Sequence, residues 1–298
     1  MSRDLVVVGA GIVGASVAYH AARAGAGVTL VDATQPGAGV TAGSFAWIGS
    51  SGVRTGPAAG LRVTATDEYR RLEAELPGLP VTWSGSLSWG TDDGAPEAGP
   101  GQQIVDAATA VTLEPTLRQP PEWAVWAPGD GAVDPVGVTE RLVAGARHHG
   151  ARVHPDTPVT GVRRDVAGRV VGAETAAGLL LGTTVVLAAG VATAALAAPL
   201  GIVVPVDPSP ATLLRFRAPA GWSALWSTTR TSISGRSPRT GCMRLQTPPT
   251  GPSPRSDRPS SAPRTSSCSA LGSDHAPCRL TASRSSARSP RCRASTWR

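Results

Sequence analysis

The chain has 298 residues, of which 41% are hydrophobic, so it is long enough for one large domain or two modest ones. Its net charge of +7 is unevenly divided: residues 226–298 contain thirteen Arg and two Asp, whereas residues 1–225 contain fifteen Arg and nineteen acidic residues. The net positive charge therefore lies in the C-terminal quarter, and it does not indicate a nucleic-acid partner for the rest of the chain.

Cysteine usage and hydropathy exclude several further classes of protein. All four cysteines lie after residue 241, and no two have the C-x-x-C spacing typical of zinc or redox sites. No apolar run approaches the roughly 18 residues that span a bilayer, and no secretory signal is visible. We therefore expect a cytoplasmic protein with no metal site and no membrane span.

The first 32 residues have the pattern of a β-α-β unit. Leu5–Val8 is a continuous apolar run, as expected of a strand that is buried on both faces of a parallel sheet. A helix is predicted from about Ile12 to Ala24, where Gly25 ends it, and a second strand follows over Val28–Asp32. This order predicts a doubly wound α/β domain.

A glycine motif, GAGIVG over residues 9–14, stands between the first strand and the helix. In such a motif Gly9 permits the tight turn, Gly11 lets the backbone approach a pyrophosphate, and Gly14 permits close packing of helix and strand. The unpaired N–H groups at the helix start then face the phosphates. Because a G-x-G-x-x-G alone is weak evidence, the assignment also depends on the neighbouring strand.

Asp32 supplies that second signal. It ends the second strand, 18 residues after Gly14, where a carboxylate can accept the hydroxyls of an adenosine ribose. Together the turn and the acid predict a dinucleotide site.

The rest of the first 217 residues alternates between loops, helices and short strands. Residues 35–60 form a long loop rich in Gly, Ser, Thr and Ala, which is typical of a functional segment. Val81–Trp89 favours a hairpin or paired strands, and residues 91–132 are expected to be irregular. Asp134 and Pro135 are the N-cap and first-turn signals of another helix. Helices are predicted near 61–76 and 135–149, and strands near 152–154, 159–164, 169–175 and 184–188.

The predicted dinucleotide site could bind either NAD or FAD, and three features favour FAD. Ala18 places a small residue on the helix face towards the sheet, and the loop 41–48 could line a flavin with backbone amides and small side chains. A late apolar strand ends at Gly190, which would lie beneath the cofactor. An NAD-binding module remains the alternative, although it would continue with regular β-α repeats.

In these motifs the sequence resembles the FAD-dependent oxidoreductase family of D-amino-acid oxidase, glycine oxidase and sarcosine oxidase. The resemblance covers about residues 4–215 and implies bound FAD and oxidation of the C–N bond of an amino acid or secondary amine by hydride transfer to flavin. The matching segments occur in the family's order: residues 6–32, SFAWI (44–48), GSL (85–87), LEP (113–115), GDGAVDP (129–135), PVTGV (158–162) and VVLAAG (185–190).

The resemblance assigns cofactor-binding positions but no catalytic residue. Gly9, Gly11, Ile12, Val13 and Gly14 match the pyrophosphate loop, and Asp32 matches the ribose acid. Ser44 and Ala46 match the loop near the flavin, Val159 matches a position whose backbone meets adenine, and Gly190 matches the last glycine. The alternative for Val159 is an ordinary strand residue. The implied partner is a small amine or amino acid, with no specific nucleic acid.

The expected fold is an α/β, Rossmann-like FAD-binding domain of the two-dinucleotide-binding type, with an incomplete substrate domain and a disordered basic C-terminal tail. Residues 1–76 and 134–217 would form the FAD-binding domain, and 77–133 a partial substrate domain.

Residues 226–298 contain 17 Ser and 13 Arg and lack an apolar stripe, which predicts disorder. The abrupt change suggests a reading-frame change near residues 218–228. A truncated, non-catalytic remnant that at most binds FAD is therefore the alternative function.

Overall fold

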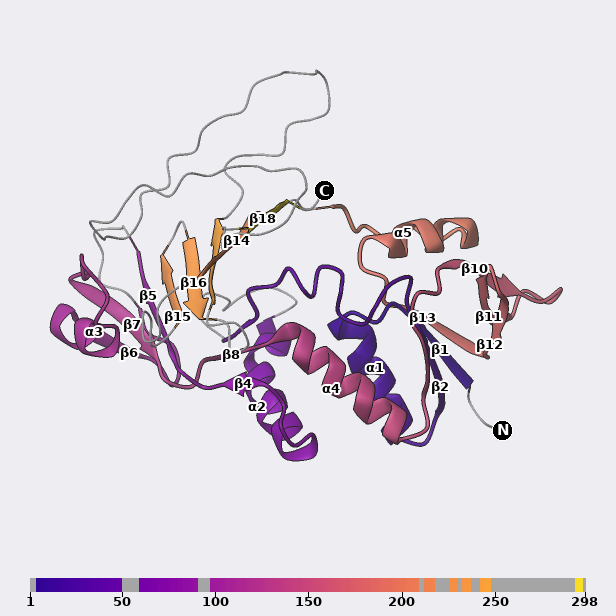
Figure 1. The fold of residues 1–298 in the computed structure, drawn as a ribbon, viewed down its shortest axis with the longest axis horizontal. Coiled ribbons are helices and arrows are strands. Elements are labelled where there is room, and N and C mark those ends of the chain that lie inside the picture. The colour runs from indigo at the N-terminus through magenta and orange to yellow at the C-terminus, as the bar shows by residue number, and fades with distance from the viewer. Residues whose placement is uncertain are drawn as a thin grey trace, which may run out of the picture.

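The computed structural model describes residues 4–49, 59–90 and 97–208, together with the backbone of five later strands (Figure 1). The later strands are β14 (Thr212–Arg217), β15 (Trp226–Thr229), β16 (Ser232–Arg236), β17 (Cys242–Thr247) and β18 (Arg293–Thr296).

A four-stranded parallel sheet forms the base of the dinucleotide site. Its strand order is β13-β1-β2-β9, and every neighbouring pair is parallel. The predicted β-α-β unit is confirmed, because helix α1 joins the two central strands. The elements are β1 (Asp4–Val8), α1 (Ile12–Arg23), β2 (Gly27–Val31), β9 (Arg152–His154) and β13 (Thr184–Leu187).

Both faces of this sheet are covered, which explains the unbroken apolar run in β1. Val7 and Leu30 pack against α1 and α4 (Pro135–His148) in the main core cluster. On the opposite face, Val6 and Val8 pack with Ala173 of a small antiparallel sheet. That sheet has the order β10-β11-β12, and a short helix lies beyond it in Figure 1. These elements are β10 (Val159–Arg164), β11 (Val170–Thr175), β12 (Gly178–Leu181), α5 (Ala192–Ala197) and the 3-10 turn η1 (Ala198–Leu200).

A second, eight-stranded sheet lies beside this domain, on the left of Figure 1. Its order is β18-β14-β17-β16-β15-β5-β7-β6, so it combines strands from the middle and the end of the chain. A short helix, α3, is capped by Asp106, whose side chain accepts a hydrogen bond from the Thr109 N–H at 2.8 Å. The middle elements are β5 (Ser86–Trp89), β6 (Gln103–Asp106), α3 (Ala107–Leu113) and β7 (Trp123–Ala127).

Three expectations from the sequence differ from this arrangement. No hairpin joins 81–89, because β4 (Val81–Thr82) pairs with β8 (Gly131–Val133) and β5 pairs with β7. Gly85 redirects the chain between them with φ +77°, and the ring of Trp126 occupies the space of a Cβ there. The segment 91–132, expected to be irregular, contains β6, α3 and β7.

The third difference concerns the end of the chain. β14 to β18 pair in one sheet with β5 to β7, whereas the sequence predicted a tail without strands over residues 226–298. β14 also pairs in this sheet, although the sequence placed 212–217 with the FAD-binding segment. The strand β14 falls where the sequence allowed strands, whereas the aromatic and β-branched residues of WSTT, which favour a strand, were obscured by the surrounding Ser and Arg.

A third small sheet, β3-β8-β4, lies between the two larger ones and holds the loop after β2. Trp47 and Ile48 form β3 and pair with Ala132 and Gly131. This pairing brings the flavin-side loop of the sequence motif next to the start of α4.

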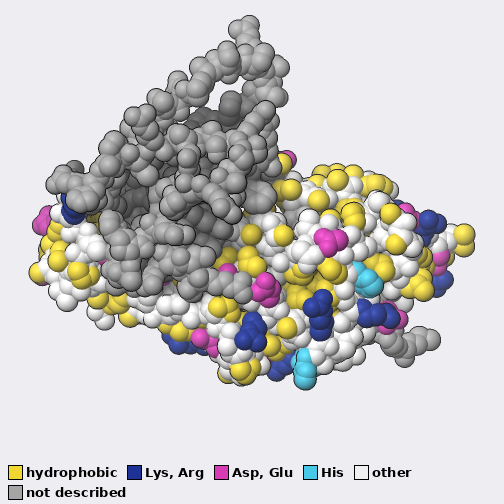
Figure 2. Space-filling model, viewed as in Figure 1, with side chains coloured by type: hydrophobic (Ala, Val, Ile, Leu, Met, Phe, Trp, Pro, Cys, Tyr) yellow, Lys and Arg dark blue, Asp and Glu magenta, His cyan; other side chains and the backbone are white. Residues whose placement is uncertain are grey.

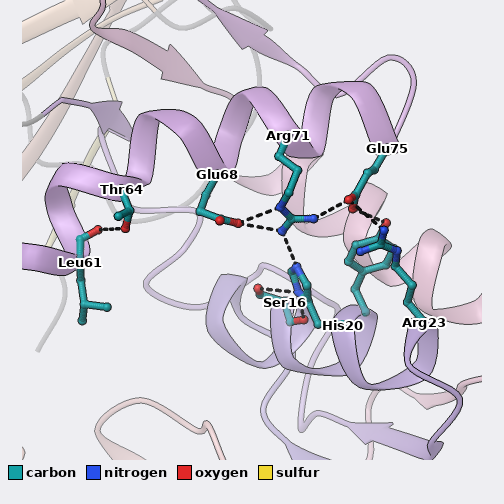
Figure 3. Close-up of polar contacts among 9 residues, drawn as sticks. Ser16, His20, Arg23, Leu61, Thr64, Glu68, Arg71 and Glu75 are labelled. Atoms are coloured by element: carbon teal, nitrogen blue, oxygen red, sulfur yellow. Dashed lines mark hydrogen bonds and ion pairs between the residues drawn. The ribbon is translucent and has the colours of Figure 1, made fainter.

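Helix α2 (Ala59–Glu75) is tied to α1 by a polar network (Figure 3). Glu75 accepts hydrogen bonds from Arg71 at 2.6 Å and from the buried Tyr19 hydroxyl at 3.1 Å, and it pairs with Arg23 at 3.0 Å. Arg71 also donates to His20 on α1 at 2.8 Å. The hydrogen bond from Arg71 lowers the pKa of Glu75.

Replacing Glu75 by Gln is expected to destabilise the fold by about 1–2 kcal/mol at neutral pH, because Arg71, Arg23 and Tyr19 lose a charged partner. A carboxyl whose pKa is lowered by folding stabilises the protein above its unfolded pKa, and it loses this effect as pH falls through its folded pKa. The difference in melting temperature between wild type and variant should therefore shrink in acid. Glu122→Gln, at an exposed position, is the control, and equal melting of wild type and Glu75→Gln at pH 7 would contradict the expectation.

Candidate functional site

The turn between β1 and α1 is closed so tightly that two of its positions require glycine. Gly9 has φ +103°, and a Cβ there would lie 2.4 Å from the Ala188 carbonyl oxygen. A Cβ on Gly14 would lie 1.8 Å from the Gly9 carbonyl oxygen. Since neither backbone oxygen can move without opening the turn, Gly9 and Gly14 serve the contact among β1, α1 and the end of β13.

Gly11 differs from these two glycines. A Cβ at this position would meet only one atom within 4 Å, the Thr41 hydroxyl oxygen at 3.2 Å. No backbone atom therefore blocks a Cβ at Gly11, although the Thr41 side chain would have to shift by a few tenths of an ångström. The bare backbone is instead suited to the close approach of a ligand, and this space fits a pyrophosphate at the start of α1.

The start of α1 is favourable for an anion. Gly11 is the N-cap residue in an extended conformation, and the first turn contains no acidic side chain. The backbone N–H of Ile12 donates to the Thr41 hydroxyl at 3.1 Å. Val13, the next residue, is 64% exposed. The positive end of the helix dipole thus meets a neutral hydroxyl and open space.

The loop from Thr41 to Ile48 is held in a defined shape over this helix start. Ala46 has φ +55°, a left-handed conformation that is uncommon for a residue with a Cβ. The Ala46 N–H donates to the Ser44 hydroxyl at 3.0 Å, and its carbonyl accepts from the Val133 N–H at 3.0 Å. These bonds fix Ser44 and Ala46, two of the predicted cofactor positions, beside the α4 start.

Asp32 lies just beyond β2 and connects it to the glycine turn. Its Oδ2 accepts from the Ala10 N–H at 2.6 Å, and its Oδ1 accepts from the Thr34 N–H at 2.7 Å and hydroxyl at 2.9 Å. The carboxylate is half-buried. A carboxylate has about four acceptor positions, so Asp32 holds the turn and retains capacity for a further donor such as a sugar hydroxyl.

A cavity of about 170 Å³ lies over the start of α1. Its lining residues come from segments that are far apart in the sequence: the start of α1, the loop 41–48, helix α2, and the β8–α4 junction. Helix α2 contributes Tyr69 to the lining, and burial raises the pKa of its phenol. The lining residues are Ile12, Thr41, Ser44, Ala46, Trp47, Ile48, Tyr69, Val133 and Pro135.

The predicted positions divide into three groups. Ile12, Ser44 and Ala46 line the cavity, while Gly9, Gly11 and Gly14 form the turn beneath it. The other four positions, Val13, Asp32, Val159 and Gly190, do not line this cavity.

Val159 and Gly190 lie near the carboxyl edge of the parallel sheet. Val159 begins β10 and packs in the cluster that contains Val8 and Val31, the last residues of β1 and β2. Gly190 has φ +58° and follows Ala188, whose N–H donates to the Val8 carbonyl at 2.7 Å. Both positions are therefore close to the strand ends where a ligand of this fold binds.

Sequence reasoning did not select Tyr69 or Pro135 as site residues. Thr41 lies in the loop 41–48 that the sequence placed near the flavin, although it was not singled out there. Tyr69 reaches the cavity only through the packing of α2, and Pro135 only through the pairing of β8 with β3. Neither contact has a local sequence signal.

The described part of the chain contains neither a cluster of metal ligands nor a membrane-spanning helix. Among residues 4–49, 59–90 and 97–208, no group of three or more His, Cys, Asp or Glu side chains could hold a metal ion. None of the described helices is long and apolar enough to cross a membrane.

The fold and the glycine turn define a dinucleotide-binding α/β protein, and comparison with known proteins identifies the kind. The family model for FAD dependent oxidoreductases matches residues 4–266, so the chain belongs to this family. The match extends beyond residue 215, where the motifs recognised in the sequence end. It gives no support to the reading of the chain as a truncated remnant.

Individual relatives agree with this assignment. A glycine oxidase from Pseudomonas aeruginosa is 29% identical over 242 residues, which cover 74% of this chain and 64% of the relative. A human mitochondrial sarcosine dehydrogenase is 29% identical over 225 residues, covering 68% of this chain and 24% of that protein. The matched regions thus span less than two thirds of either relative.

Solved structures show the same fold at lower identity. Glycine oxidase from Geobacillus kaustophilus superimposes with a TM-score of 0.72 and 21% identity, covering 84% of this chain and 73% of that one. L-proline dehydrogenase from P. horikoshii gives a TM-score of 0.73 and 20% identity, with 85% and 73% covered. The chain therefore shares the fold of these two solved structures.

Proposed function

We propose that this chain binds FAD across the glycine turn and oxidises the C–N bond of a small amino acid or secondary amine. The observation that carries the proposal is the bare backbone at Gly11, where a Cβ would meet the Thr41 hydroxyl and no backbone atom. When bound, FAD supplies the hydride-accepting flavin, and the protein supplies binding, orientation and exclusion of water.

Each predicted position has a role in this proposal. Gly9, Gly11, Ile12, Val13 and Gly14 hold the pyrophosphate with backbone N–H groups and the helix dipole. Asp32 binds the adenosine ribose, and Val159 and Gly190 lie along the cofactor at the sheet edge. Ser44 and Ala46, with Thr41, line the path towards the flavin.

In this proposal the parallel sheet and the eight-stranded sheet have different roles. The segments 1–76 and 134–208 would hold the cofactor around the parallel sheet, as the sequence suggested with a boundary at 217. The eight-stranded sheet, starting from 77–133, would carry the substrate domain. No catalytic residue is assigned, since catalysis of this type needs no conspicuous acid–base pair.

The names of the relatives suggest the substrate class. They are described as acting on glycine, sarcosine, dimethylglycine and L-proline, all small amino acids or N-substituted amines. We propose the same class for this chain. A specific nucleic-acid partner is not part of the proposal, because Arg and acidic side chains are interspersed on the face of the described residues that Figure 2 shows. The expected cytoplasmic location stays a prediction.

Cofactor uptake tests the proposal directly. Purified full-length protein is incubated with FAD and separated from free cofactor, and the visible flavin absorbance of the protein fraction is recorded. Retained flavin with turnover of glycine, sarcosine, dimethylglycine or L-proline is the expected result. Preference for nicotinamide dinucleotides would favour the NAD-binding alternative, and absence of any bound flavin would overturn the proposal.

Replacing Asp32 by Asn is expected to weaken FAD binding about 10- to 100-fold, the effect of losing a hydrogen bond to a charged group. The Asn side chain has only one acceptor oxygen, so the contact with either Ala10 or the ribose is lost. Asp165→Asn is the matched control, because Asp165 accepts backbone hydrogen bonds in the β10–β11 turn, outside the site. Equal FAD affinity of Asp32→Asn and wild type would refute the ribose assignment.

A further inference from the structure

Thr34 binds one oxygen of the Asp32 carboxylate, and the glycine turn binds the other. The Thr34 N–H and hydroxyl donate to Asp32 Oδ1 at 2.7 Å and 2.9 Å. The Ala10 N–H donates to Asp32 Oδ2 at 2.6 Å. The other acceptor within reach of the Thr34 hydroxyl, the Gln35 carbonyl, is farther away at 3.5 Å. The carboxylate is therefore held in one orientation by donors on both oxygens.

The donors around Asp32 leave its two oxygens unequal. A carboxylate has about four acceptor positions, two on each oxygen. Thr34 occupies both positions on Oδ1, and Ala10 occupies one of those on Oδ2. The remaining position is on Oδ2, the oxygen that contacts the glycine turn. A ribose hydroxyl that binds Asp32 without displacing a donor must therefore donate to Oδ2.

The backbone around Asp32 is fixed without the Thr34 hydroxyl. The Asp32 N–H donates to the His154 carbonyl at 3.0 Å, and the Asp32 carbonyl accepts from the Thr157 N–H at 2.7 Å. The Thr34 carbonyl also accepts from the Asp156 N–H, at 3.3 Å. These bonds join the loop after β2 to the loop after β9, and Thr34 itself is exposed. The hydroxyl is thus free to serve the orientation of the carboxylate.

We propose that Thr34 is a positioning residue for the adenosine end of FAD. Its hydroxyl fixes the Asp32 carboxylate so that Oδ2 presents its open acceptor position to a ribose hydroxyl. Because the carboxylate is oriented before FAD arrives, less ordering has to accompany binding. The inference rests on the proposed function, since it requires FAD across the glycine turn.

The test is an FAD titration of the full-length apoprotein with Thr34→Val, which keeps the branched shape and the backbone N–H and removes the hydroxyl. The FAD dissociation constant should rise about 3- to 10-fold, as for the loss of one hydrogen bond. Thr34→Ser, which restores the hydroxyl, should bind FAD as the wild type does. Affinity in Thr34→Ser as low as in Thr34→Val would overturn the inference.

A second comparison separates positioning from a general effect on the fold. In Asp32→Ala, Thr34 has no carboxylate to orient. Adding Thr34→Val to Asp32→Ala should therefore leave the FAD dissociation constant of Asp32→Ala unchanged. A purely structural threonine would lower the affinity by the same factor in both backgrounds, and that result would also overturn the inference.

Thr116→Val is the matched control, because the Thr116 hydroxyl likewise donates to a carboxylate two residues earlier, that of Glu114. Neither residue lines the cavity, so this variant should keep wild-type FAD affinity. Wild-type affinity in Thr34→Val would overturn the inference, while flavin uptake by the wild type upholds the proposed function. Failure of the wild type to take up FAD overturns both.

Discussion

Protein with Gly11 replaced by Val is expected to fold and to be purified without FAD. A Cβ at this position would meet only the Thr41 hydroxyl, which must shift by a few tenths of an ångström, while the branched carbons of Val extend into the space proposed for the pyrophosphate. An overlap that costs about 3 kcal/mol would reduce FAD affinity at least about 100-fold. Flavin absorbance after gel filtration and far-UV circular dichroism measure the two effects separately.

The control for this variant is Gly60→Val. Gly60 lies in α2, and a Cβ there has no atom within 4 Å. This variant should retain both fold and flavin. If Gly11→Val retained FAD as well as this control does, the β1–α1 turn would not be the pyrophosphate site.

Gly14→Ala should destabilise the fold itself. The added methyl group would lie 1.8 Å from the Gly9 carbonyl oxygen, so α1 must move away from the end of β1. We expect a loss of about 3 kcal/mol or more, which lowers the melting temperature of a domain of this size by about 6–12 °C. Thermal unfolding followed by circular dichroism measures this. A wild-type melting temperature would show that helix and strand do not approach so closely.

The parts of the fold that follow from the sequence are those with a strong local cause. The glycine turn, α1 and the Asp134 cap of α4 are confirmed, because φ > 0 at Gly9, apolar runs and capping residues act within a few positions. Asp134 accepts from the Val136 N–H at 3.2 Å, as its N-cap position predicts.

Strand partners could not be predicted in the same way. β4 and β5 are separated by only three residues and enter different sheets, because Gly85 turns the backbone against Trp126. β5 instead pairs in parallel with β15, about 140 residues later. Such pairing depends on the whole fold and has no signature in either segment.

The residues of the candidate site likewise differ in whether local sequence could identify them. Ile12, Ser44 and Ala46 could be recognised from motifs, whereas Tyr69 and Pro135 reach the cavity only through tertiary packing. Trp47 stands in the loop that the sequence placed near the flavin, and it lines the cavity.

The walls of the cavity come from residues 12, 41–48, 69 and 133–135. The glycine turn lies among the first fifteen residues. A chain that is still being synthesised nevertheless cannot complete this cavity until Pro135 has emerged from the ribosomal exit tunnel. A cofactor that needs all these walls binds only the folded state and so stabilises it by mass action. Cellular flavin supply should then influence how much of this protein survives quality control after translation.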